Sequence, residues 1–94
     1  MAIFIMAMSL NPNAKKEHGD LSHQIDESLA VFKKYGVKLS QLYATMGRYD
    51  IVAVFDTENH STAFKVASSI TSMGILDTET WPVIPFEEFQ QLVG

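Results

Sequence analysis

Eight side chains in this sequence are of types that bind or activate small molecules. They are His18, His23, Tyr43, Arg48, Tyr49, Asp50, Glu79 and Trp81. Arg48 suits a carboxylate-bearing ligand, because a guanidinium donates two parallel hydrogen bonds to a carboxylate. His23 suits proton transfer near neutral pH. If a ligand pocket exists, we expect His18, His23, Arg48, Tyr49 and Asp50 to converge in it, where the 47–50 turn, the 9–19 loop or the start of the first helix come together.

The Arg48–Asp50 tripeptide has two interpretations. As a site, Arg48 would hold an anion, and Tyr49 or Asp50 would donate or accept a proton. As a turn, Gly47 would adopt a positive φ, Tyr49 would pack at a hairpin, and Asp50 would accept hydrogen bonds from nearby backbone N–H groups. We favour the turn, since it explains the residue types without a ligand. It predicts that Gly47→Val destabilises the fold strongly.

The spacing of the remaining candidate residues does not indicate a metal site. His18 and His23 are five residues apart, whereas two ligands on one helical face are three or four apart. Solvated loop and cap positions explain them better. Tyr43, Glu79 and Trp81 fit either a cavity wall or the rim of a dimer interface, and the sequence leaves both open.

Composition argues against several classes of function. The formal net charge is −4 and the longest basic runs are two lysine pairs, so neither nucleic acid nor an anionic membrane is an expected partner. Cysteine is absent, and so are a Ser-His-Asp order, a Gly-rich phosphate loop and a metalloprotease motif. We therefore expect neither a cofactor nor a metal. The apolar run at the N-terminus, about eight residues, is too short to span a bilayer, and the cytoplasm is the expected location.

Hydrophobic periodicity predicts one α+β domain over residues 1–94. Strands are expected at 2–8, 37–46, 51–55 and 75–84, and helices at 21–35, 59–73 and directly after Pro85. The last helix is expected to bury Phe86, Phe89, Leu92 and Val93. Strands 1 and 3 are apolar at every position and should be central, whereas charged residues mark strands 2 and 4 as edges.

A βαββαβ order with right-handed crossovers gives a four-stranded antiparallel sheet in the order 4-1-3-2, a ferredoxin-like fold with a short C-terminal helix. In strand 2, strict alternation places Leu39, Gln41 and Tyr43 on one face. Two helices cover only one face of such a sheet, yet strands 1 and 3 are apolar on both. We therefore expect a second copy to cover the other face, in a homodimer or higher homo-oligomer.

Two motifs resemble those of the GYD-domain family. Gly47-Arg48-Tyr49-Asp50, followed by a hydrophobic strand, is similar to the family's Gly-x-Tyr-Asp signature. The segment 74–80, Gly-Ile-Leu-Asp-Thr-Glu-Thr, is similar to its second motif, and the resemblance runs from about Phe4 to Phe89. It implies a ferredoxin-like fold of the dimeric α+β barrel kind and no particular activity or catalytic residue. The loops at 9–13 and 56–59 depart from the family pattern.

Three functions fit these observations. The first is a small dimeric domain that binds a small organic molecule or serves as an accessory or regulatory subunit. The second is a cofactor-independent enzyme of the monooxygenase or isomerase kind on the dimeric barrel, an idea that rests on fold analogy alone. The third is a purely structural homo-oligomer. A polar-lined interior would favour the first two, and an interface filled by Ile, Val, Phe and Met would favour the third.

Overall fold

The predicted strands and helices all form, at nearly the expected places, in the computed structural model, which describes residues 2–14 and 20–94. The elements are β1 (Ala2–Leu10), α2 (Leu21–Lys34), β2 (Leu39–Ala44), β3 (Ile51–Thr57), α3 (His60–Ser72), β4 (Leu76–Val83) and α4 (Phe86–Val93). No helix in these described ranges is long and apolar enough to cross a membrane.

The four strands form one antiparallel sheet in the order β2-β3-β1-β4. This is the predicted order, read from the other edge, and it confirms the ferredoxin-like α+β fold. β1 and β3 are central as expected, because only a central strand needs apolar side chains on both of its faces.

Each long helix begins at a capping side chain and is followed by a glycine. The Asp20 side chain caps α2 by accepting a hydrogen bond from the backbone N–H of His23 at 3.0 Å, and Asn59 caps α3 in the same way at Ser61. Gly36 follows α2 with a φ of +72°, and Gly74 follows α3 with a φ of +78°. Glycine tolerates this left-handed conformation, so it ends each helix at little cost.

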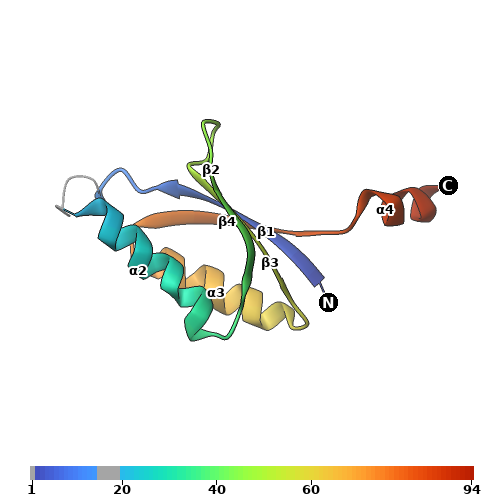
Figure 1. Ribbon diagram of the computed structural model, residues 1–94, viewed down its shortest axis with the longest axis horizontal. Helices are drawn as coiled ribbons and strands as arrows, with labels where there is room; N and C mark the ends of the chain where they lie inside the picture. The colour runs from blue at the N-terminus through green and yellow to red at the C-terminus, as the bar shows by residue number, and fades with distance from the viewer. Residues whose placement is uncertain (1, 15–19) are drawn as a thin grey trace.

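The core lies between the two long helices and one face of the sheet. Figure 1 shows α2 and α3 side by side on the same side of the strands. Phe55 is fully buried there, with its ring centroid 5.5 Å from that of Phe4 and 5.1 Å from that of Phe32. Met6 and Ile70 complete the centre of this core, from β1 and α3.

Within residues 2–14 and 20–94, no helix lies on the opposite face of the sheet (Figure 1). It presents apolar side chains from the central strands, and their cross-strand partners share the face. Ile5 lies opposite Val54 on one side and Trp81 on the other, and Ile3 lies opposite Val83. We call this surface the open face.

Two details differ from the prediction. A β-bulge lies between Leu39 and Gln41, so Leu39 pairs with Phe55 on the helix side while Gln41 pairs with Val54 on the open face. The extra residue in the bulge breaks the alternation that the sequence pattern assumed. In addition, α4 buries none of its residues, because it projects away from the sheet at the end of the long axis (Figure 1).

Candidate functional site

Four of the predicted site residues meet beside the open face. The Tyr49 hydroxyl donates a hydrogen bond to the Glu79 carboxylate, and the Trp81 indole N–H donates to the same carboxylate at 2.9 Å. The rings of Tyr49 and Trp81 meet edge to face, 6.1 Å between centroids. The guanidinium of Arg48 lies 5.7 Å from the centre of the Tyr49 ring. We call Arg48, Tyr49, Glu79 and Trp81 the Glu79 cluster.

The sheet positions the carboxylate and the indole. Glu79 and Trp81 are two residues apart on β4, so their side chains leave the strand on the same face. Ala7 lies directly opposite Glu79, and it is fully buried. The Glu79 cluster therefore stands over a small residue in the central strand.

The loop between β2 and β3 positions the other two members. Thr45 holds this loop closed, since its hydroxyl donates to the Tyr49 carbonyl oxygen and its backbone N–H donates to the Asp50 carbonyl oxygen. Asp50 ties the loop to β1, where its carboxylate accepts the Leu10 N–H at 2.8 Å and its own N–H donates to the Met8 carbonyl oxygen. Asp50 thus has the backbone-binding role expected of a turn.

Hydrogen bonding shifts the pKa values of both Tyr49 and Glu79 further from neutral pH. The bond to Glu79 raises the pKa of the Tyr49 phenol above its ordinary value, so Tyr49 is neutral at physiological pH. The same bond, helped by the Trp81 N–H, lowers the pKa of the Glu79 carboxyl, so Glu79 is ionised. Neither group titrates near pH 7. The arrangement therefore binds and orients better than it transfers protons.

Tyr43 lies across the sheet from the cluster. It pairs with Val52, which pairs with Ala7, which pairs with Glu79, so one row of side chains crosses all four strands. Tyr43 is about half exposed at one edge of the open face, and Glu79 is exposed at the other.

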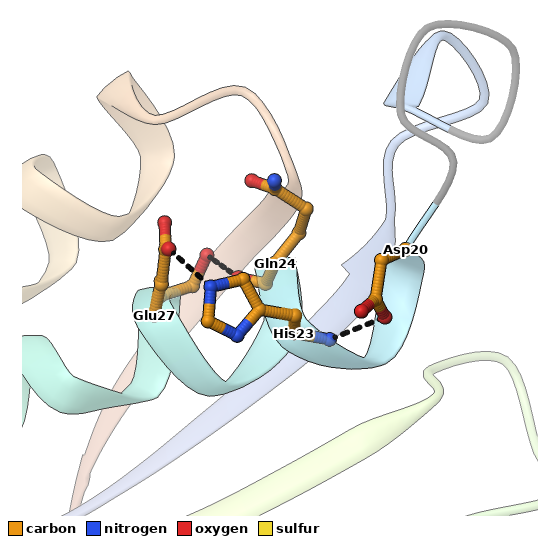
Figure 2. Close-up of polar contacts among 5 residues, drawn as sticks. Asp20, His23, Gln24 and Glu27 are labelled. Carbon is orange, nitrogen blue, oxygen red and sulfur yellow. Dashed lines mark hydrogen bonds and ion pairs between the residues drawn. The ribbon is translucent and has the colours of Figure 1, made fainter.

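The two histidines do not belong to this arrangement. His18 lies outside the described residues. His23 lies on α2, in the helical layer on the other side of the sheet, and its imidazole is 2.7 Å from the Glu27 carboxylate one turn further along the helix (Figure 2). Within the ranges 2–14 and 20–94, no group of three or more metal-ligating side chains is found.

The prediction that Gly47 adopts a positive φ is wrong. Positive φ values in the described ranges are confined to Gly36 and Gly74, and a Cβ atom added to Gly47 would meet no other atom within 4 Å. The expected strong destabilisation by Gly47→Val therefore loses its physical basis. Thr45 and Asp50 hold the turn through hydrogen bonds, which leaves Gly47 in an ordinary conformation.

The structure also contains a cavity that the sequence did not predict. About 330 Å³ lies between α3 and β4, with Phe4, Phe64, Thr80 and Pro82 among its lining residues. The Thr80 hydroxyl is the one buried side-chain polar atom in the described residues that lacks a hydrogen-bond partner. Threonines at alternate positions of β4, Thr78 and Thr80, were the only signal, and an edge strand explains them equally well.

Comparison with solved structures shows the fold. A domain from Porphyromonas gingivalis, assigned as the C-terminal regulatory domain of aspartate kinase, is similar with a TM-score of 0.64, 10% identity, and coverage of 86% of this chain and 50% of that one. FFRP-DM1 matches with a TM-score of 0.61 and 16% identity, over 89% of this chain and all of its own. Prephenate dehydratase from Streptococcus mutans matches with a TM-score of 0.59 and 18% identity, over 84% and 40%.

The chain therefore spans half of the first of these structures, all of the second and two fifths of the third. No curated protein matches the sequence significantly. The model of the GYD domain matches residues 4–93, which is nearly the whole chain and includes both motifs. The chain belongs to the GYD domain family.

Proposed function

We propose that this protein is a homodimeric, small-molecule-binding regulatory domain, whose ligand is held by the Glu79 cluster where two open faces meet. The observation that carries the proposal is the cluster itself. It places a preorganised carboxylate, two aromatic rings and a guanidinium beside an otherwise apolar surface. Ligand sites typically combine an apolar wall with a few oriented polar groups.

Arg48 indicates the chemical class of the ligand. It forms no ion pair with any residue in the described part of the chain, although it lies over the Tyr49 ring. A guanidinium that is oriented but not paired suits a ligand carboxylate. Glu79 retains acceptor capacity beyond its two bonds, because a carboxylate offers about four lone-pair sites. The ligand we expect is a small organic acid with a second polar group.

The dimer follows from the open face. Ile3, Ile5, Val52, Val54 and Val83 form a continuous apolar surface there. Exposed apolar surfaces of this kind mark interfaces, and two-fold homodimers are the most frequent soluble assembly. A second copy would also close the Glu79 cluster off from bulk water, which strengthens a charged hydrogen bond to a ligand.

The pKa directions favour binding over catalysis. An enzyme that moves protons at neutral pH needs a group that titrates there, whereas Tyr49 and Glu79 are shifted away from pH 7 in opposite directions. One structural neighbour is assigned as a regulatory domain, which agrees with a binding role, and at 10% identity this similarity shows the fold alone.

The first test is native mass spectrometry of the protein purified from its own host. It reports the subunit number and any retained ligand in one measurement. Trp81 then gives a direct assay, because it is the sole tryptophan and touches Glu79. The retained molecule, or benzoate and short aliphatic carboxylates as probes, should change its fluorescence.

Arg48→Ala should weaken that binding by about ten-fold or more, which corresponds to one charge-assisted hydrogen bond. Arg48→Lys, which keeps the charge and loses the two-point contact, should lie between Arg48→Ala and the parent. A dimer that retains no ligand and shows no fluorescence response to any probe would contradict the binding role and favour a purely structural assembly.

A further inference from the structure

α4 has an apolar side that no described residue of its own chain covers. Phe86, Phe89, Leu92 and Val93 lie on one side of this helix, and even the least exposed of them, Phe89, is 49% exposed. A helix of eight residues is not stable in water by itself, since nucleation is costly and helices below about 12 residues are marginal. Its helical state therefore requires a surface to pack on.

A groove of matching chemistry lies where α2 ends and β2 begins. This cavity of about 380 Å³ has apolar walls from Leu29, Phe32, Val37 and Leu39. Two lysines, Lys33 and Lys38, also line it. α4 carries two acidic residues in its first turn, Glu87 and Glu88. The helix and the groove are thus complementary both in apolar surface and in charge. We call this cavity the α2–β2 groove.

We infer that α4 of each copy docks in the α2–β2 groove of a second copy, so that the dimer is closed by two exchanged helices. The inference rests on the dimer of the proposed function, and it names the segment that each copy supplies. It does not depend on the ligand at the Glu79 cluster.

The strand register places the helix and the groove correctly for this exchange. Val83 at the end of β4 pairs with Ile3, and Ile3 pairs with Asp56. The neighbouring residue Phe55 pairs with Leu39 at the start of β2. The C-terminal end of β4 and the beginning of β2 therefore lie at the same end of the sheet, on opposite edges.

A two-fold axis between two open faces, running along the strands, exchanges the edges of the sheet and keeps its ends. It brings the end of β4 in one copy next to the start of β2 in the other. Facing sheets pack about 10 Å apart, and α4 must also pass the partner's edge strand, because the groove lies on the helix side of that sheet. Two linker residues, Ile84 and Pro85, span up to about 7 Å and an eight-residue helix adds about 12 Å. Within its own chain, α4 leaves the sheet at the edge furthest from the groove.

Cysteine cross-linking tests the contact, because the parent chain has no cysteine. Gln90→Cys flanks the apolar side of α4, and Lys33→Cys lies in the α2–β2 groove. The two variants are co-expressed with different tags and treated with a short bismaleimide. We expect a product that joins one chain of each kind. The matched control replaces Lys33→Cys by Lys65→Cys, on the exposed side of α3, and should give none.

Three results would overturn the inference in distinguishable ways. A dimer in sedimentation that gives no product with Lys33→Cys would reject the exchanged helix and leave the proposed dimer intact. A monomer in sedimentation would reject both. Cross-linking within one chain that carries Gln90→Cys and Lys33→Cys together would show that α4 folds back on its own copy, which also rejects the exchange.

Charge reversal provides an independent readout. Lys33→Glu with Lys38→Glu should raise the dimer dissociation constant by about 2- to 5-fold for each pair lost, the range of exposed ion pairs. Adding Glu87→Lys and Glu88→Lys to the same chain should restore the parent value. Weakening without restoration would show that the lysines act on something other than α4.

Discussion

The hydrogen bond between Tyr49 and Glu79 should make the folding stability depend on pH. The carboxyl pKa of Glu79 is lowered from its ordinary 4.5, so its contribution to stability is complete above pH 4.5 and is lost as the pH falls through the lower folded value. The phenol pKa of Tyr49 is raised from 10.0, so its contribution is complete below pH 10.0 and is lost as the pH rises through the higher folded value. The bond therefore stabilises most between these limits.

Thermal denaturation of Tyr49→Phe and Glu79→Gln checks this. Each variant should melt below the parent at pH 7, and the difference should disappear for both at low pH and for Tyr49→Phe at high pH. Asp26→Asn, at an exposed position on α2, serves as the control and should melt close to the parent at pH 7. A difference that is constant from pH 3 to pH 11 would contradict the hydrogen bond.

Glycine substitutions distinguish a turn that needs a positive φ from one that does not. Gly36→Ala forces a side chain into a φ of +72° and should destabilise the protein by about 1–2 kcal/mol, measured by urea denaturation. Gly47→Ala should change the free energy of unfolding by less than about 0.5 kcal/mol, because Gly47 has no positive φ and its Cβ would meet open space. Equal effects at both positions would contradict this assignment.

At the scale of elements, three aromatic residues join β1, α2 and β3. Phe55 is fully buried and its ring contacts those of Phe4 and Phe32. Phe55→Ala should therefore lower the free energy of unfolding by about 3–5 kcal/mol. The matched control is Phe64→Ala on α3, whose side chain is 75% exposed and whose loss should cost far less. Similar losses for the two variants would show that Phe55 is not central to the core.

The bulge in β2 belongs to the same scale. It turns Gln41 and Tyr43 toward the open face while Leu39 remains with Phe55 on the helix side. An edge strand can carry an extra residue because one of its sides has no ladder to preserve. Tyr43 thereby joins the row that ends at Glu79.

At the scale of the whole molecule, neighbouring residues of β3 face different layers. Ala53 is fully buried toward the helices, whereas Val54 lies on the open face between Gln41 and Ile5. Ala53→Lys should unfold the chain, because a buried unpaired charge is costly. Val54→Lys should leave the circular dichroism spectrum intact and convert the proposed dimer to a monomer.

Sedimentation velocity and circular dichroism, measured on both variants at micromolar concentration, distinguish these outcomes. A Val54→Lys variant that remains dimeric would remove the open face as the interface. Unfolding of Val54→Lys would show instead that this surface is needed within one copy.

The sequence determined the elements, their order in the sheet and the family, because periodicity, helix caps and two motifs are local features. The sequence also favoured a backbone-binding role for Asp50. It did not indicate the partners, since the Leu10 N–H that donates to the Asp50 carboxylate and the Met8 carbonyl oxygen that accepts from the Asp50 N–H belong to a strand about forty residues earlier. The open face was predictable because two helices cannot cover two faces of a sheet.

Only the tertiary structure decided the rest, because it depends on distant segments meeting. Tyr49 and Glu79 are thirty residues apart in sequence, and pairing of β4 with β1 brings the carboxylate to the turn. His23 was separated from Arg48 by the sheet, which no spacing rule reveals. The apolar pattern of α4 correctly predicted a helix, but whether its own chain covers that helix depends on the direction in which β4 leaves the sheet.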